Sequence, residues 1–199
     1  IEIWGNDPAL QDTPGEDGPT DNVIIRNNSI WLKVPDIGNA GATGLQVKTY
    51  EVSNISFINN AVEIAFEGVL NNYGYRMAGI STWSTQVFKA VDYNRFMYPA
   101  NHKNVDWYSK GDLTAKQDVF IETLQTWQQM TGFDMNSSFG PLGFMEPQFP
   151  ANDLSPAFGS ALIDAGDPNQ CPATDILGTP RPQGGACDIG PYECKGNCL

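Results

Sequence analysis

The chain has 199 residues, of which 41% are hydrophobic, and 23 acidic against 11 basic side chains give a formal net charge of −12. This length and apolar content suit one domain with a sizeable core. An acidic surface repels nucleic acid and anionic lipid, which argues against both as partners. No stretch approaches the roughly 18 to 20 apolar residues of a membrane span, so we expect no membrane insertion. The 20 Gly and 14 Pro predict many turns and few helices.

The N-terminal half contains a repeat of the form N-h-x-h-x-N-N, where h is an apolar residue. Residues 22–28 read NVIIRNN and residues 54–60 read NISFINN. Side chains alternate faces along a strand, so the apolar positions of the two copies would stack in a core. Asn27 and Asn59 would lie at a turn and hydrogen-bond between layers, which predicts an asparagine ladder.

A second pair of strands precedes the first. Residues 1–4 (IEIW) and 45–48 (LQVK) each lead into one copy of the repeat. Two strand types that recur in the same order are typical of a solenoid of stacked rungs. Long turns over residues 7–21 and 34–41 separate the strands, and residues 62–98 are expected to form a third rung.

One helix is predicted, over residues 123–132. Thr123 can cap its start and Gly132 suits its left-handed end. An apolar stripe at helical spacing consists of Leu124, Trp127 and Met130. We expect Trp127 to anchor this helix on the strands rather than to stack on a sugar. A Pro-rich strap over residues 141–156 follows.

The four cysteines all follow residue 170 and are interpreted as two disulfides, Cys171 with Cys187 and Cys194 with Cys198. The sequence leaves the two other pairings open. A zinc site is the alternative, but zinc sites use short cysteine or histidine pairs, and the chain has one His. Disulfides indicate an oxidising compartment and therefore secretion.

The order of motifs near the C-terminus is the most specific signal. It runs SALIDAGD (160–167), CPATD (171–175), GTPRP (178–182) and CDIGPYE (187–193). This order resembles the C-terminal end of secreted bacterial right-handed parallel β-helix proteins, many of them similar to polysaccharide lyases.

The resemblance implies an all-β fold, a right-handed parallel β-helix of about three rungs, and an extracellular or cell-surface location with a polysaccharide partner. Residues 1–112 would form the rungs. Residues 113–199 would add one short helix, the strap and a disulfide-stapled C-terminal cap, packed on the same solenoid as a single domain.

Charged side chains in the C-terminal motifs are candidates for a site. They are Asp164, Asp175, Arg181, Asp188 and Glu193. Their spacing among Gly and Pro favours turn capping and an Arg–carboxylate clamp over an active site.

In β-helix enzymes of this kind the substrate lies along an outward strand face, as the resemblance implies. The repeat alignment places Glu2 beside Gln46 and Trp4 beside Lys48, all pointing outward. The expected substrate contacts are Trp4, Gln46, Trp83 and Tyr98. The expected catalytic residues are Lys48, Arg95 and His102, with Lys48 as the base of a polysaccharide lyase or glycoside hydrolase. An ordinary solvated stripe is the alternative, so catalysis stays open.

Two further expectations concern ions and partners. The acidic loop offers oxygen ligands for Ca²⁺ from Asp12, Glu16, Asp17 and Asp21, without matching the EF-hand pattern. Residues 1–4 read as a strand in mid-coil, which predicts either upstream rungs of a longer chain or contact with copies of itself. The sequence therefore predicts a polysaccharide-associated protein, and the alternative is a structural or adhesive subunit that stacks head-to-tail into a filament.

Overall fold

In the computed structural model the described residues are 1–4, 19–34, 41–48, 51–66, 76–82, 84–98, 107–110, 118–121 and 123–196. This part of the chain is mostly β-structure with one α-helix, which confirms the predicted all-β class. Most of both predicted long turns, and the predicted boundary at residue 112, lie outside it. No helix in the described part is long and apolar enough to cross a membrane.

Three sheets are built from parallel strands. The first consists of β1 (Glu2–Trp4), β5 (Gly41–Lys48), β9 (Arg76–Thr82) and β12 (Trp107–Lys110), with β13 (Asp118–Ile121) antiparallel at one edge. The second consists of β3 (Ile24–Arg26), β7 (Ile55–Ile58) and β10 (Phe88–Asp92). The third consists of β4 (Ser29–Val34), β8 (Ala61–Phe66), β11 (Arg95–Met97) and β14 (Ser138–Phe139).

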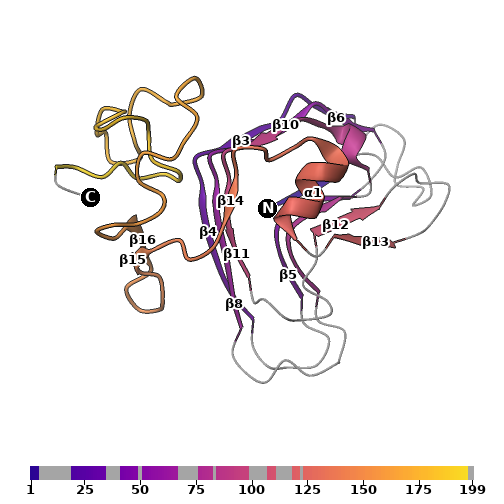
Figure 1. Ribbon diagram of the computed structural model, residues 1–199, viewed down its shortest axis with the longest axis horizontal. Helices are drawn as coiled ribbons and strands as arrows, with labels where there is room; N and C mark the ends of the chain where they lie inside the picture. The colour runs from indigo at the N-terminus through magenta and orange to yellow at the C-terminus, as the bar shows by residue number, and fades with distance from the viewer. Residues whose placement is uncertain are drawn as a thin grey trace.

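The chain visits these sheets in the same order on each pass, where a pass is a stretch that adds one strand to each sheet. The first pass is β1, β3 and β4, the second is β5, β7 and β8, and the third is β9, β10 and β11. Between the first and second sheets the chain forms β2 (Thr20–Asp21) and β6 (Val52–Ser53), which pair in parallel, and the short 3₁₀ turn η1 (Thr85–Val87). Figure 1 shows the strands of successive passes lying side by side.

The register confirms the predicted repeat. Ile25 pairs with Phe57 and Phe57 with Val91, and all three side chains are buried. Two glycines let the first sheet approach the third. A Cβ on Gly44 would lie 2.6 Å from Val62 Cγ1, and one on Gly79 would lie 2.7 Å from Phe96 Cδ1. The interior is therefore a packed apolar core with no room for larger side chains at these two positions.

A ladder of asparagines joins the passes, one residue later than predicted, and its members Asn60 and Asn94 are fully buried. Asn60 Oδ1 accepts hydrogen bonds from the backbone N and Nδ2 of Asn28, at 3.1 and 2.9 Å. Asn94 Oδ1 accepts in the same way from Asn60, at 2.9 and 3.2 Å. The predicted ladder residues Asn27 and Asn59 instead adopt φ of 55° and 57°. This left-handed conformation, which Asn tolerates, turns the chain from the second sheet to the third. The side chain of the following residue, Asn28 or Asn60, then forms the ladder hydrogen bonds.

The predicted helix is confirmed as α1 (Leu124–Thr131). Thr123 Oγ1 accepts from the backbone N of Thr126 at 3.1 Å, and Gly132 ends the helix at φ 74°. Trp127 is fully buried and anchors α1 on the core, as expected. Met130, predicted as part of the apolar stripe, is 60% exposed, because Leu124 and Trp127 alone face the core.

Residues 141–196, which we call the C-terminal segment, pack against the side of the third sheet. Within it, β15 (Phe144–Glu146) and β16 (Asp153–Pro156) form a short antiparallel pair in the predicted strap. A small apolar cluster joins the segment to the outer face of the sheet and consists of Ala61, Leu142, Phe144, Leu162 and Ile189. Figure 1 shows the third sheet between this segment and the other strands. The segment thus covers one outer face of the stacked passes.

The predicted disulfide between Cys171 and Cys187 is wrong in this structure, since both are free thiols. Burial raises the pKa of the Cys187 thiol, and a hydrogen bond with Cys171 raises it further. Cys194 is disulfide-bonded, and Cys198 lies outside the described residues, so their pairing stays a prediction.

Replacement of Asn60 by Ala tests the ladder. The change removes the acceptor of both Asn28 donors and one of the two donors to Asn94 Oδ1, so we expect the free energy of unfolding to fall by about 3 kcal/mol in urea denaturation. Asn169→Ala is the matched control, because Asn169 is exposed and bonds only to Asp167 in its own turn. Equal losses in the two variants would contradict the ladder's role.

Titration of thiols in the denatured, unreduced protein tests the cysteine state. We expect two reactive thiols per chain, from Cys171 and Cys187. In the native protein the raised pKa of Cys187 and its burial should slow its alkylation relative to Cys171. A count of zero thiols would show that Cys171 and Cys187 form the disulfide that the sequence predicts.

Candidate functional site

The strands of the first sheet pair in the register that the repeat predicts. Glu2 pairs with Gln46, Gln46 with Ser81, and Ser81 with Tyr108, while Trp4 pairs with Lys48. This confirms the predicted alignment of Glu2 with Gln46 and of Trp4 with Lys48. Gln46 is half-buried and Ser81 is buried. The side chains of Glu2, Trp4 and Lys48 lie outside the described part, so their contacts stay predictions.

Arg95 and Tyr98 lie on or beside the third sheet, and both have structural contacts. The Arg95 guanidinium donates to Ser138 Oγ at 2.8 Å and to the Pro141 carbonyl at 3.1 Å, and partial burial lowers its pKa. Tyr98 is 3% exposed and its ring packs edge-on against Phe139, with the centroids 4.7 Å apart. The prediction of Tyr98 as a sugar contact is therefore wrong, because the ring is buried. Arg95 holds the C-terminal segment on the sheet rather than facing open solvent.

Most of the remaining predicted residues lie outside the described part of the chain: Trp83, His102, Asp12, Glu16 and Asp17. Asp21 is described and exposed, and it links the first two passes. Its Oδ1 accepts from Ser53 Oγ at 2.5 Å and from Asn54 Nδ2 at 2.7 Å, and these hydrogen bonds lower its pKa. No cluster of three metal-binding side chains occurs among the described residues. The calcium site stays a prediction.

Asp134 is the most deeply buried carboxylate of the described strands and turns, and it terminates the ladder. Its side chain accepts from Trp127 Nε1 at 2.9 Å, from Asn94 Nδ2 at 3.0 Å and from Ser137 Oγ. Burial raises its pKa to about 6 in spite of these three donors. Because Asp134 is fully buried, it cannot meet a substrate, and its role is structural.

The charged C-terminal motif is likewise structural, as predicted. Arg181 Nε lies 3.3 Å from Glu193 Oε2, and Arg181 Nη2 donates to the Gly190 carbonyl at 2.9 Å. Glu193 also accepts from the backbone N of Asp188 at 3.0 Å. Asp175 Oδ1 caps its own turn through the backbone N of Leu177 and of Thr179, at 2.8 and 2.7 Å. The cluster folds the segment on itself and offers no open acid or base.

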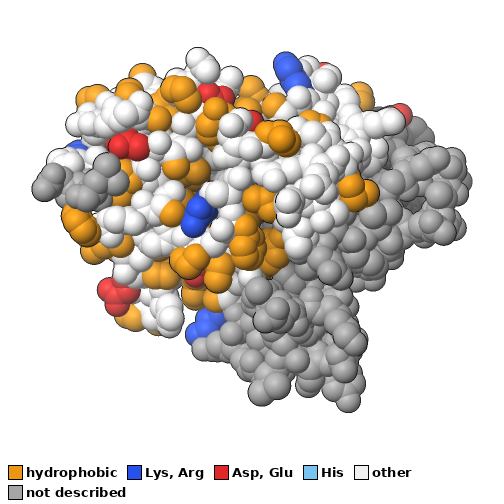
Figure 2. All heavy atoms as spheres, in the orientation of Figure 1, with side chains coloured by type: hydrophobic (Ala, Val, Ile, Leu, Met, Phe, Trp, Pro, Cys, Tyr) orange, Lys and Arg blue, Asp and Glu red, His pale blue; other side chains and the backbone are white. Residues whose placement is uncertain are grey.

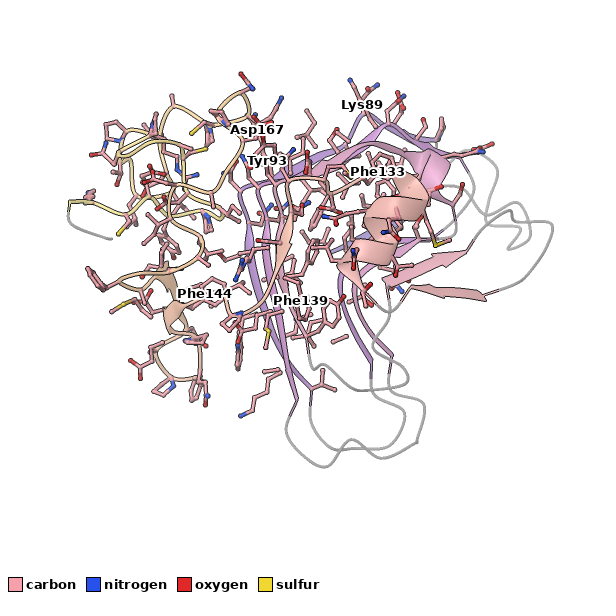
Figure 3. All side chains as sticks on the ribbon, in the orientation of Figure 1. Lys89, Tyr93, Phe133, Phe139, Phe144 and Asp167 are labelled. Atoms are coloured by element: carbon pink, nitrogen blue, oxygen red, sulfur yellow. The ribbon has the colours of Figure 1, made fainter. Side chains whose placement is uncertain are left out.

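A second outward row, on the third sheet, was missed by sequence reasoning. Trp31 pairs with Glu63 and Glu63 with Met97. Trp31 Nε1 donates to Glu63 Oε1 at 3.3 Å, and burial raises the pKa of Glu63. Trp31 and Met97 also pack against the apolar cluster that includes Phe144, which Figure 3 shows between the β15–β16 pair and the third sheet. Extending the NVIIRNN and NISFINN alignment by a few residues would have placed Trp31 beside Glu63.

Exposed apolar side chains are spread over the C-terminal segment, where Figure 2 shows them among polar atoms. The most exposed are Met145, Phe149, Phe158, Ile176 and Leu177, with Phe149 84% exposed. They lie on the opposite side of the third sheet from the predicted stripe. Substitutions of these side chains can therefore serve as controls when the predicted stripe on the first sheet is mutated.

Comparison with protein-family models gives no match, and comparisons with curated proteins and with solved structures give none either.

The pH dependence of stability tests the role of Asp134. Its pKa is raised to about 6 from 3.8, so the folded chain binds this proton more tightly than the unfolded chain. The stability of the protein relative to Asp134→Asn should therefore rise as pH falls from 7 to 4.5, by at most about 3 kcal/mol. Urea denaturation of both proteins at each pH measures the difference in the free energy of unfolding, and the contributions of the other carboxylates to the pH dependence cancel in this difference. A difference that stays flat would contradict the raised pKa.

Proposed function

We propose that the chain is a right-handed parallel β-helix protein that binds polysaccharide along an outward strand face, in an extracellular setting. The order of strands supports the fold, since each pass adds one strand to each of three parallel sheets. The ladder of Asn28, Asn60 and Asn94 supports it too, because such ladders recur at turns of stacked coils. The C-terminal motifs that resemble those of secreted β-helix proteins support the location and the ligand class.

The register of the first sheet is the observation that carries the function. Neighbouring strands lie about 4.8 Å apart, so Glu2, Gln46 and Ser81 form a straight row along the sheet. Trp4 and Lys48 form a second row beside it. A straight array of carboxylate, amide and aromatic groups suits a linear polymer with repeating hydroxyl groups, since the aromatic face covers a sugar ring and polar groups bind its hydroxyls.

Charge narrows the ligand class. A protein with a net charge of −12 repels polyanions, so the proposed ligand is a neutral polysaccharide. An acidic polysaccharide would need Ca²⁺ to bridge the two, for which Asp12, Glu16, Asp17 and Asp21 remain the proposed ligands. Binding with and without a chelator distinguishes the two cases.

Catalysis by the same face depends on Lys48. A lyase reaction needs an acidic polysaccharide, because its base removes the proton beside a uronate carboxyl group. Lys48 could therefore serve only on the Ca²⁺-bridged acidic ligand, and only if its pKa fell towards neutrality. Polysaccharide binding is therefore the function we propose, with lyase or hydrolase activity as an addition that Lys48→Ala would abolish.

Head-to-tail stacking into a filament is the second candidate. It is favoured by one observation, that β1, β3 and β4 each pair on one side only within the described residues. The opposite end of the ladder weighs against it, because Asp134 and Ser137 already occupy the donors of Asn94 there. A head-to-tail contact would have to displace them.

Binding to immobilised neutral polysaccharides, measured as retardation in affinity gels, tests the proposal. We expect Trp4→Ala to weaken binding by about tenfold and Gln46→Ala by less, because a stacked ring buries more area than an amide. Phe149→Ala is the matched control, since Phe149 is exposed on the C-terminal segment and should bind like the wild type. Retardation by no polysaccharide, or equal losses from Trp4→Ala and Phe149→Ala, would reject this face as the site.

A further inference from the structure

Four side chains form a small square on the outer face of the third sheet, which we call the Trp31 patch. Trp31 pairs with Glu63, and two residues further along the same strands Lys33 pairs with Ala65. Side chains alternate faces along a strand, and the intervening Ile64 is buried in the core. The four side chains of the patch therefore point away from the core.

The Trp31 ring is held in place by the protein itself. Its Nε1 donates to Glu63 Oε1 at 3.3 Å, and the ring packs against the apolar cluster that includes Phe144 of the C-terminal segment, which lies beside the third sheet in Figure 3. Trp31 is only half-buried, so part of the indole stays at the surface. A side chain that is already fixed loses little conformational entropy when a ligand binds, which favours affinity.

Ala65 is the short corner of the patch. It is half-buried, and its side chain ends at Cβ, whereas the side chains of Trp31, Glu63 and Lys33 extend further from the sheet. Neighbouring strands lie about 4.8 Å apart, and residues on the same face of one strand are about 6.6 Å apart. The space over Ala65, between the three longer side chains, is therefore about as wide as one six-membered ring.

The charges around this space favour a neutral ligand. Glu63 is half-buried, and burial raises its pKa although the hydrogen bond from Trp31 opposes the shift. Its carboxylate repels an anion, and the exposed Lys33 in the neighbouring row repels a cation. A carboxylate accepts hydrogen bonds and an ammonium group donates them, so both can bind hydroxyl groups. An indole face with one acceptor and one donor beside it suits a sugar ring.

We propose that the Trp31 patch binds one neutral sugar ring, as a second carbohydrate site that shares no residue with the first sheet. The ring would lie over Ala65 and against the indole of Trp31. Glu63 would accept from one of its hydroxyl groups, and Lys33 would donate to another. The ligand class rests on the function proposed above, whereas the position of the site rests on the third sheet alone.

The indole N–H signal of Trp31 in the NMR spectrum of the ¹⁵N-labelled protein reports on the patch directly. It is identified as the signal that Trp31→Phe lacks. The probes are three neutral oligosaccharides, namely cellohexaose, mannohexaose and xylohexaose. At least one of them should shift this signal in a saturable way. The same shift is expected in Trp4→Ala, in which the site proposed on the first sheet has lost its aromatic contact.

Substitutions at Ala65 separate the proposed site from the rest of the sheet. Ala65→Leu fills the space over the sheet and should raise the Kd at least about tenfold through steric exclusion. Ala65→Ser is the matched control, because it keeps a short side chain and should bind within about twofold of the wild type. If thermal melting shows that Ala65→Leu does not fold, Ala65→Gln fills the same space with a flexible side chain and takes its place.

Glu63→Gln tests the role of the carboxylate. It keeps the size of the side chain and loses its charge, and hydrogen bonds to charged acceptors are about twice as strong as those to neutral ones. We therefore expect the Kd to rise about fivefold. A Kd equal to that of the wild type would contradict the contact between Glu63 and the sugar.

Three outcomes would overturn the proposal. They are a Trp31 signal that none of the oligosaccharides shifts, a shift that persists unchanged in Ala65→Leu, and a shift caused by choline but by none of the sugars. The last outcome would identify an organic cation as the ligand. A Trp31 signal that does not move, together with weaker gel retardation of Trp4→Ala, would reject this site and leave the first sheet as the binding face. A Trp31 shift without any effect of Trp4→Ala on retardation would reject the first sheet alone.

Discussion

Amide groups inside an apolar interior constrain everything else in this molecule. A buried amide without partners costs a few kcal/mol, so Asn60 and Asn94 are tolerable only if each pass delivers its own asparagine to the same place. The left-handed residue before each of them, Asn59 or Tyr93, sets that place by turning the chain from the second sheet to the third. Register, turn geometry and core packing of Phe57 and Val91 then follow from one repeated hydrogen bond.

Buried charged side chains also stabilise the fold at two further points. Asp134 closes the ladder under Trp127, and Arg181 with Glu193 folds the C-terminal segment against itself. The carboxylates of Asp134 and Glu193 are buried and accept from donors of the fold itself, so the acidic surface of the chain consists of other side chains. Outward strand faces, where the register aligns side chains of successive passes, are therefore the surfaces that can meet a ligand. The C-terminal segment already covers much of one such face.

Sequence reasoning succeeded where a pattern repeats and failed where a single residue shifts the geometry. The pairing of Ile25 with Phe57 and of Glu2 with Gln46 follows from aligned strands, and it was predicted. The ladder position was missed by one residue, since a left-handed Asn and a buried Asn look the same in an Asn-Asn pair. Burial of Tyr98 under Phe139 depends on a strand some forty residues later, which no local pattern reveals. The state of Cys171 and Cys187 depends on side-chain geometry, on which spacing says little.

Asp134, at the end of the ladder, also limits where a pass could be duplicated in such a chain. An amide both receives and gives hydrogens, so a duplicated segment with an asparagine at the ladder position can be inserted between Asn28 and Asn94 without leaving a group unsatisfied. An ionised carboxylate only receives, so a copy that placed the equivalent of Asp134 in the middle of the series would leave the following acceptor empty. Gene duplication upstream of Asp134 is thus chemically tolerated, and duplication across it is not.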